Sequence, residues 1–419
     1  MTQSRNSRWS TAGLGLMVVV FTLALVVFPK QGFEAGISGL RVFWDIVFPS
    51  LLPFFILSEL MLGLGIVRGV GILLEPLMRP LFSVPGIGAF ALSMGLAAGY
   101  PMDAVITARF RENGLCTRIE GERLLAFTNT ADPLFMFGAV AVGMLKSPEL
   151  GALLALAHYI SAFLVGIAFK FWGRNQESTP KEPRSISAPN IFVRAYFEML
   201  KAREEDARPF GKLLGNAVTE SIQTLLMICG FIVFFAVLIE ILHLSGLMAV
   251  FGWPVGVVYH LFGVHQGLVN PTLAGFLEID IGSAQTAAMA APLLQKVALI
   301  SGIIAWSGLA VHAQVASVLT QTDIRMTPYF LARFLHAVLA AGITVILFGL
   351  GVGKAVSHTF ASVIPVNAFS QANYPASHWW QMMENSLSLW LSVIGILVVL
   401  SILFYLVRRI RIIVFRATL

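Results

Sequence analysis

The sequence predicts an all-α polytopic membrane protein built from two repeats. Of its 419 residues, 57% are hydrophobic and only 12% are charged, and the mean hydropathy is +0.81; a soluble domain has about 25% charged residues. Apolar segments follow one another in the same order in both halves. Several are interrupted by Gly, Pro and polar residues where a continuous membrane helix would carry Leu and Val. We therefore expect re-entrant hairpins and broken helices, with about eight full crossings of the bilayer.

Charge and cysteine content exclude several function classes. The net charge of +6 fits cationic loops on the cytoplasmic side of a membrane protein, so the expected partner is the lipid bilayer and not nucleic acid. The two cysteines, Cys116 and Cys229, have no metal-type spacing. The sequence contains no nucleotide-binding fingerprint, P-loop, HExxH or GxSxG motif. We expect neither an enzyme nor a metal site nor a resident cofactor.

The first half begins with an N-terminal transmembrane helix and a short loop over residues 1–42. An apolar run at 11–28 is stopped by Pro29-Lys30 and is not followed by a cleavage site, so we interpret it as a retained helix and not as a signal peptide. Residues 43–172 form the first repeat. Its expected parts are a span at 43–67, an amphipathic interfacial segment at 68–82, a re-entrant hairpin at 86–109, a broken helix at 124–145 and a closing helix at 148–172.

The second half repeats this order after a linker. Residues 173–213 carry mixed charge, with Pro180, Pro183 and Pro189 among them, and form a cytoplasmic linker, which we expect to be helical from Ile191 onward. Residues 214–350 form the second repeat. Its parts are a long span at 214–242, an amphipathic piece at 246–262, an interrupted segment at 268–294, a broken helix at 297–319 and a closing helix at 328–350. An external loop at 351–386 and a C-terminal transmembrane helix with a basic tail at 387–419 complete the chain.

Counting spans from a cytoplasmic N-terminus predicts that the two repeats are inverted. The arginine-rich stretch 109–123 and the linker both fall inside, so the second repeat starts from the opposite side to the first. The loop 351–386, with one lysine and the pair Trp379-Trp380, falls outside, whereas the C-terminal arginines fall inside. Both placements agree with the positive-inside rule. The N- and C-termini are therefore expected in the cytoplasm.

The breaks contain four carboxylates at membrane depth. Each ionised carboxylate there costs at least ~2.5 to 3.5 kcal/mol on insertion scales, so they must be paired, protonated or hydrated. Two interpretations remain open: they line a pathway, or they form ion pairs and helix caps that lock the breaks. Arg109 is the nearest cation in the sequence. The four residues are Asp103, Asp132, Glu278 and Asp280.

Hydroxyl and amide side chains accompany these carboxylates. Thr128-Asn129-Thr130 precedes Asp132-Pro133, a pair suited to start a half-helix whose N-terminus would attract an anion. Ser307-Gly308 occupies the matching place in the second half, and His312 and Gln314 could continue the lining. The alternative is that such side chains only join helices. His312 could carry a coupling proton, whereas His158 and His243 are expected to cap or snorkel near helix ends.

Several runs resemble the YlbJ (SpoVV) family of sporulation integral membrane proteins. They are Pro49-Ser-Leu-Leu-Pro-Phe-Phe-Ile-Leu-Ser-Glu59, Leu74-Glu-Pro-Leu-Met-Arg-Pro-Leu-Phe82, Gly99-Tyr-Pro-Met102 and Phe127-Thr-Asn-Thr-Ala-Asp-Pro-Leu-Phe135. The resemblance implies two nucleoside-recognition (Gate) domains with an architecture like that of concentrative nucleoside transporters. It also implies a spore-forming bacterium, a place in the outer forespore membrane, and movement of dipicolinic acid from mother cell towards forespore. By analogy, the protein could form a homo-oligomer.

The resemblance assigns substrate and coupling-ion contacts to the hairpin tips and broken helices. Dipicolinate is a planar aromatic dianion, so its site needs helix N-termini, hydroxyl or amide donors, a cation and an aromatic slot. Tyr100 and Trp306 are the candidates for the slot. The coupling ion, H⁺ or Na⁺, stays open. The candidate substrate-binding residues are Gly99, Tyr100, Asp103, Thr128, Asn129, Thr130, Asp132, Glu278, Asp280, Gly282, Ser283, Trp306, Ser307, Gly308 and His312.

Other functions are open at this stage. Nucleoside or other small-solute transport is the alternative carrier function. It comes second to dipicolinate transport because the residues at the breaks differ from the nucleoside transporters' own motifs. A non-transporting membrane scaffold or sporulation signalling protein is a further alternative, from another functional class. An intramembrane protease using Ser307 and His312 is disfavoured, because their spacing on one helix places serine and histidine badly for attack.

Overall fold

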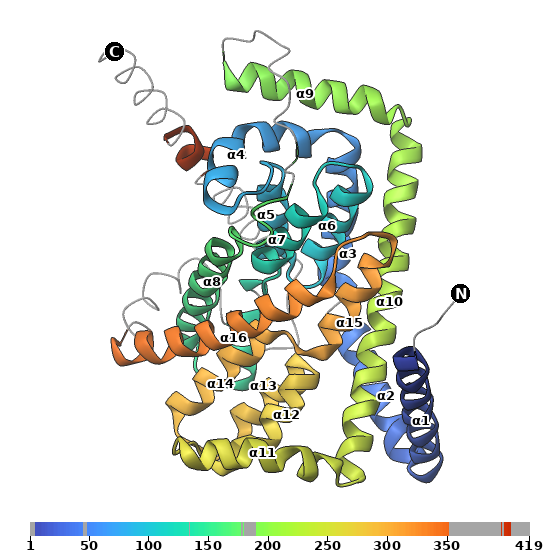
Figure 1. The fold of residues 1–419 in the computed structure, drawn as a ribbon, viewed down its shortest axis with the longest axis vertical. Helices are drawn as coiled ribbons and strands as arrows, with labels where there is room; N and C mark the ends of the chain where they lie inside the picture. The colour runs from blue at the N-terminus through green and yellow to red at the C-terminus, as the bar shows by residue number, and fades with distance from the viewer. Residues whose placement is uncertain are drawn as a thin grey trace, which may run out of the picture.

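The computed structural model describes residues 5–44, 48–133, 135–176, 179, 190–351, 395 and 398–403, and every regular element in these ranges is a helix (Figure 1). The all-α prediction is confirmed. Beyond Gly351, the external loop 351–386 and almost all of the C-terminal segment 387–419 lie outside the described residues. The elements are α1 (Arg5–Val27), α2 (Pro29–Val42), α3 (Phe48–Gly63), α4 (Ile66–Phe82), α5 (Gly88–Ala98), α6 (Met102–Glu112), α7 (Arg118–Thr128), η2 (Phe135–Met144), α8 (Glu149–Phe169), α9 (Ile191–Asp206), α10 (Phe210–Leu244), α11 (Leu247–Leu261), η3 (Gln266–Leu268), α12 (Val269–Leu277), α13 (Ile279–Ala288), α14 (Leu293–Trp306), α15 (Gly308–Val318), η4 (Leu319–Gln321) and α16 (Met326–Gly349).

The helices are long and apolar enough for a membrane protein. Among the described residues, α8, α10, the α14–α15–η4 segment and α16 each meet the length and composition of a membrane span, and two bent helix pairs raise the number to six. The chain is a polytopic membrane protein, as predicted. The expected total of about eight crossings stays a prediction, because the last expected span lies outside the described residues.

The N-terminal region differs from its prediction in one respect. Residues 29–42, expected as a short loop, form α2, which meets α1 at an angle of 103°. Pro29 is in the first turn of the helix, where a missing N–H costs nothing. Gly36 and Gly39 then face α10, and an added Cβ on Gly39 would lie 3.2 Å from the Cβ of Ala236. Small residues of this kind let two membrane helices approach closely.

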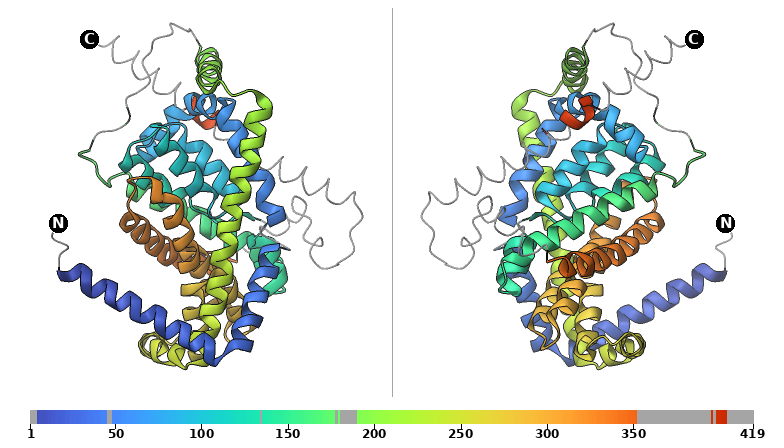
Figure 2. Two further views of the ribbon diagram at one scale, coloured as in Figure 1. Left: turned by 90° about the vertical axis from the view of Figure 1, so that its right-hand side faces the viewer. Right: turned by 90° about the vertical axis from the view of Figure 1, so that its left-hand side faces the viewer.

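A long helix connects the two ends of the molecule. In Figure 1, α10 runs along most of the long axis, with α9 and α4 near one end and α11 near the other. Helix α9 begins at Ile191, as predicted, and packs on α4, where Arg68 forms an ion pair with Glu205 at 2.6 Å. Helix α1 leans away from the body in both views of Figure 2. Helix α10 thus separates the amphipathic helices α4 and α11.

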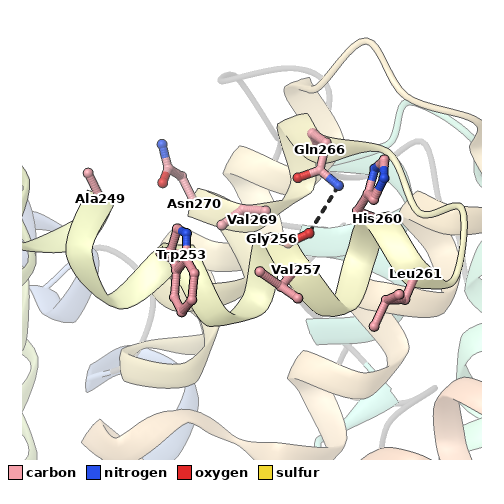
Figure 3. Close-up of a pocket in the computed structure, with 10 residues that line it drawn as sticks. Ala249, Trp253, Gly256, Val257, His260, Leu261, Gln266, Val269 and Asn270 are labelled. Carbon is pink, nitrogen blue, oxygen red and sulfur yellow. Dashed lines mark hydrogen bonds between the residues drawn. The ribbon is translucent and has the colours of Figure 1, made fainter.

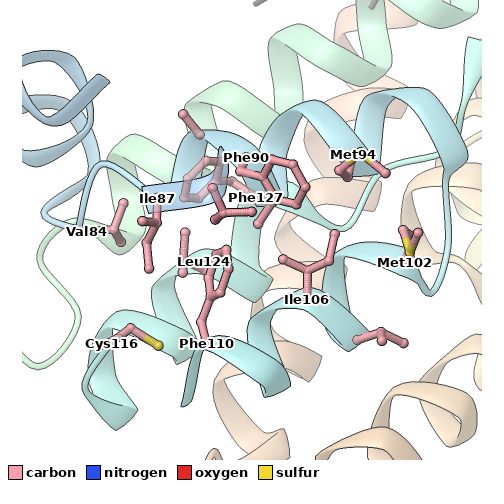
Figure 4. Packing of buried hydrophobic residues seen from close by; sticks show 14 of the residues in the cluster. Val84, Ile87, Phe90, Met94, Met102, Ile106, Phe110, Cys116, Leu124 and Phe127 are labelled. Carbon is pink, nitrogen blue, oxygen red and sulfur yellow. The ribbon is translucent and has the colours of Figure 1, made fainter. Parts of the chain in front are cut away.

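The elements of the two halves come in the same order, as predicted. An amphipathic helix (α4 or α11) precedes a helical hairpin (α5–α6 or α12–α13), a broken helix (α7–η2 or α14–α15) and a closing helix (α8 or α16). That the halves are inverted relative to each other stays a prediction. The first hairpin and α7 enclose an apolar core that includes Phe90, Met94, Ile106 and Phe127 (Figure 4).

Ion pairs join the two halves near the start of α7. Arg111 donates to both carboxylate oxygens of Asp323, at 2.7 and 2.9 Å, and Arg325 donates to Glu122 at 2.8 and 3.1 Å. The loop before α7 and the loop before α16 therefore lie on the same side of the molecule. Arg109, the sequence-based candidate partner for the carboxylates of the breaks, instead pairs with Glu59, Glu112 and Glu220. That pairing prediction is wrong.

Candidate substrate site

Each hairpin tip packs against the broken helix of its own half. Gly99 has φ +70° at the first tip, and a Cβ added there would lie 2.8 Å from Oδ2 of Asp132. Ser307 and Gly308 both have positive φ in the second broken helix, and a Cβ on Gly308 would lie 3.0 Å from the Cα of Glu278. Only glycine allows both the left-handed backbone and the close approach. The four predicted breaks therefore form two contacting pairs.

The two pairs also contact each other. The Tyr100 hydroxyl, at the first hairpin tip, donates to the carbonyl oxygen of Ile304 in α14 at 2.6 Å. The Tyr329 hydroxyl of α16 donates to Oδ1 of Asn129 at 2.9 Å. Because these bonds join the first half to the second, all four breaks belong to one region of the molecule.

Asp103, Thr128 and Asn129 form one buried hydrogen-bonded group. Asn129 donates to Oδ1 of Asp103 at 2.8 Å, and the Thr128 hydroxyl lies 3.2 Å from Oδ2. All three side chains are fully buried. Thr130, also buried, donates to the carbonyl oxygen of Thr128. The predicted polar residues of the first half are thus brought together, with the carboxylate of Asp103 accepting from an amide and a hydroxyl.

Side chains of α8 and α16 satisfy the backbone that the α7 break leaves free. The N–H of Ala131 donates to Nε2 of His158 at 3.0 Å, and its carbonyl accepts from the Tyr159 hydroxyl at 3.1 Å. Arg333 donates to the carbonyl oxygens of Asn129 and, at 2.6 Å, Ala126. A non-helical segment at membrane depth requires such internal partners. His158 is therefore a buried support of the break and not the helix-end residue that the sequence predicts.

Arg333 is a site residue that the sequence reasoning missed. Its side chain is fully buried, and besides α7 it reaches the carbonyl of Ala305 in α14 at 3.5 Å. A guanidinium suits this position because carbonyls at a helix C-terminus carry partial negative charge. The available signal was a charged residue inside the apolar segment 328–350, which at membrane depth is a functional candidate by default.

Two of the intramembrane carboxylates cap helices. Oδ1 of Asp132 accepts from the N–H of Phe135 at the start of η2, and Oε2 of Glu278 accepts from the N–H of Ile281 in α13 at 2.8 Å. Asp280 lies in the first turn of α13 and interacts electrostatically with both carboxylates. The capping role that the sequence allowed is thus observed for Asp132 and Glu278, and helix N-termini favour their negative charge.

The second broken helix has an aromatic side. Trp306 donates from Nε1 to the carbonyl of Phe276 and stacks on the Phe276 ring, with centroids 5.1 Å apart. His312 lies 4.3 Å from the Trp306 ring and donates from Nδ1 to the carbonyl of Gly308. Within the described residues, no ring contact joins Trp306 to Tyr100. That Tyr100 and Trp306 supply an aromatic slot stays a prediction.

Three further predicted residues, Gly282, Ser283 and Ser307, differ in what they contact. A Cβ on Gly282 would lie 2.1 Å from the Cα of Gly275, so this glycine allows α12 and α13 to touch. Ser307 donates to the carbonyl of Trp306. The Ser283 hydroxyl is fully buried, and no described residue pairs with it. Ser283 is therefore a donor still available to a ligand in the second half.

A separate groove lies away from the breaks. It has a volume of about 580 Å³ and lies between α11 and the start of α12, where Trp253, Val257 and Gln266 line it (Figure 3). Gln266 donates to the carbonyl of Gly256 across its floor. None of its lining residues is a predicted site residue, so the groove and the candidate site are different places.

A curated relative is similar to most of the chain. The sporulation integral membrane protein YlbJ of Bacillus subtilis (strain 168) is 44% identical to this chain over 345 residues, which are 82% of this chain and 84% of that protein. No protein-family model matches the sequence. Among solved structures, that of a doubly substituted variant of CNTnw in an outward-facing state matches with a TM-score of 0.36 and 12% identity, over 83% of this chain and 87% of that one.

Proposed function

The chain belongs to the family of the sporulation integral membrane protein YlbJ, and on that premise we propose that it is a secondary transporter. Its substrate is dipicolinate, which it moves from the mother cell towards the forespore across the outer forespore membrane. Both termini lie in the cytoplasm of the mother cell. The substrate site is the region where the two hairpin tips and the two broken helices meet.

The convergence of four backbone breaks is the observation that supports transport. A scaffold needs no broken helix at membrane depth, since each break removes intrahelical hydrogen bonds and requires dedicated partners. Here His158, Tyr159 and Arg333 provide those partners for the first broken helix. Paired interrupted helices in two halves are the arrangement that transporters use to bind substrate near the bilayer midplane.

One buried cation is the feature of the region that supports an anionic substrate. Arg333 brings a full positive charge to the centre of the breaks, and Asn129 links it to the carboxylate of Asp103. The other three carboxylates gather at the starts of η2 and α13, where helix N-termini offset their charge. Ser283 adds a free donor. A carboxylate next to Arg333 therefore meets a cation whose Nε–H has no partner among the described residues, as an aromatic dianion requires.

Uptake into liposomes tests this proposal directly. Purified protein is reconstituted, and labelled dipicolinate and a labelled nucleoside are offered in parallel, with protein-free liposomes as the blank. We expect saturable dipicolinate uptake and no nucleoside uptake. Uptake of the nucleoside without uptake of dipicolinate would show that the transported substrate is a nucleoside. If folded protein takes up neither compound, the alternative function of a non-transporting scaffold is favoured. In cells, forespores that lack this protein but accumulate normal dipicolinate would contradict the assignment.

A further inference from the structure

Two buried histidines lie side by side behind the α7 break. His158 of α8 and His336 of α16 have ring centroids 4.6 Å apart, and both side chains are at most 1% exposed. Neither belongs to the predicted substrate site. Burying two imidazoles in contact is costly unless their polar atoms are used, so their hydrogen bonds indicate what the pair can do.

The backbone determines where each imidazole carries its proton. Nε2 of His158 accepts the N–H of Ala131, so the neutral ring carries its hydrogen on Nδ1. Nε2 of His336 lies 2.9 Å from the carbonyl oxygen of His158, which can only accept, so Nδ1 of His336 is bare. No described residue pairs with either Nδ1. The pair thus presents one free donor and one free acceptor, both buried.

Arg333 adds a third free nitrogen on the same face. It precedes His336 by three positions on α16, so the two side chains are neighbours, and its Nε–H is buried with no partner among the described residues. Arg333 and His158 are the titratable groups that act on His336, and Arg333 acts on His158. Other charged residues of the helices that pack on α16 have other partners or positions. Lys296 of α14 donates to the carbonyl of Ala287, Glu122 and Arg123 of α7 bind Trp172, and Glu149 is at the start of α8.

We propose that Nδ1 of His336 is the proton-binding atom of this transporter, and that it takes up one proton when a carboxylate substrate binds next to Arg333. The inference rests on the proposed function. The proton adds to the free electron pair of Nδ1, and Nε2–H keeps its bond to the carbonyl of His158. No bond is broken, and the new Nδ1–H joins the free N–H groups of His158 and Arg333 as a third donor for the anion.

The other histidine cannot take this role. His158 already carries hydrogen on Nδ1, and a proton on its Nε2 would remove the acceptor for Ala131. Arg333 explains the coupling, since its positive charge opposes a second cation on His336 until a carboxylate offsets it. Substrate binding then favours the proton, and the proton favours substrate by the same factor.

Calorimetry on the wild-type protein tests the coupling without any substitution. Dipicolinate is titrated into purified protein at one pH in two buffers of different ionisation enthalpy, and again between about pH 6 and 8. We expect uptake of one proton per dipicolinate and an affinity that rises up to about tenfold for each unit by which the pH falls. Binding without proton uptake would overturn this inference and leave the proposed function intact. No binding at all would overturn the proposed function itself.

Two matched substitutions test which histidine binds the proton. His336→Gln keeps an N–H group for the carbonyl of His158 but cannot be protonated, so we expect dipicolinate binding with no proton uptake and a flat pH dependence. His260→Gln, in the separate groove, is expected to behave as the wild type. Proton uptake that persists in His336→Gln would place the proton elsewhere and overturn the assignment. His336→Asn is measured in the same way if His336→Gln does not give a folded, monodisperse protein.

Discussion

At the scale of single residues, Arg333 has the most demanding environment. It places a full positive charge in the interior of a membrane protein, and it donates to carbonyl oxygens of α7 and α14. A charge in the segment 328–350 is visible in the sequence. Its partners cannot be predicted from the sequence, because every residue has a main-chain carbonyl and these carbonyls become available only where a helix is broken.

Replacing Arg333 tests whether it supports the breaks. Arg333→Gln leaves three carbonyls with weaker donors, so we expect a loss of stability of about 3 kcal/mol, measured as a fall in the unfolding temperature in detergent. Arg325→Gln, whose side chain is half exposed, is the matched control and is expected to lower the unfolding temperature less than Arg333→Gln does. Equal losses in both variants would contradict a special role for Arg333.

Asn129 allows a second test at this scale. Its amide donates to Asp103 and its oxygen accepts from Tyr329, so Asn129→Ala removes two buried hydrogen bonds, at about 1–3 kcal/mol for each. We expect dipicolinate uptake to fall at least tenfold while the protein still reaches the membrane. Asn270→Ala, in the separate groove, should transport as the wild type. Normal uptake by Asn129→Ala would remove this residue from the site.

At the scale of elements, local residue types were enough to locate all four breaks. Glycine, proline and polar letters mark the positions where the helices are interrupted, because these residues adopt or cap non-helical backbone. The helix α2 was missed for the same reason, since Pro29 and three glycines predict a loop when the packing on α10 is unknown. Residue types along the chain therefore predicted the interruptions of helices correctly. They did not predict α2, a helix that is stabilised by its contact with α10.

Gly308 allows a test of the contact between the second tip and the second broken helix. Gly308→Ala places a Cβ at 3.0 Å from Glu278 with φ at +72°, a backbone that costs about 1–2 kcal/mol for an L-residue. We expect dipicolinate uptake to fall at least tenfold. Gly342→Ala in α16, where an added Cβ meets nothing within 4 Å, should be neutral or slightly stabilising. Similar uptake in the two variants would mean that the contact is not needed.

At the scale of the whole molecule, the ion pairs between the halves agree with the predicted topology. The loops before α7 and before α16 lie together through Arg111 and Asp323, and the count of spans places both in the cytoplasm. The order of elements could be predicted from the sequence because the breaks have the same spacing in both halves. The ion pairs could not, since 28 basic and 22 acidic residues allow many combinations.

Cysteine labelling tests this topology. Asn113→Cys, beside the α6–α7 turn, and Lys146→Cys, beside the η2–α8 turn, should react with a membrane-impermeant maleimide from opposite sides, Asn113→Cys from the cytoplasm. Burial raises the pKa of the Cys116 thiol to about 12, so this natural cysteine should stay unlabelled near neutral pH. Cys229 is replaced by alanine in both variants. Labelling of both positions from one side would refute the predicted arrangement.

The Arg111–Asp323 pair makes a prediction about pH. The hydrogen bonds from Arg111 hold the pKa of the Asp323 carboxyl below its ordinary value, so the pair contributes fully above an unfolded pKa of about 3.9 and is lost as the pH falls through the lower, folded value. Because Asp323 is half exposed, the contribution is under about 1 kcal/mol. Asp323→Asn should therefore lower the unfolding temperature slightly at pH 6 and not at the lowest pH tolerated.

The single guanidinium shared by α7 and α14 limits how the protein can move. Since Arg333 donates to backbone carbonyls at the breaks of both broken helices, a displacement of α16 must shift both at once or break those bonds. The two broken helices then move together as one unit and not independently. A fluorophore on either half should report the same relaxation, a single exponential with one rate constant, after rapid mixing with substrate.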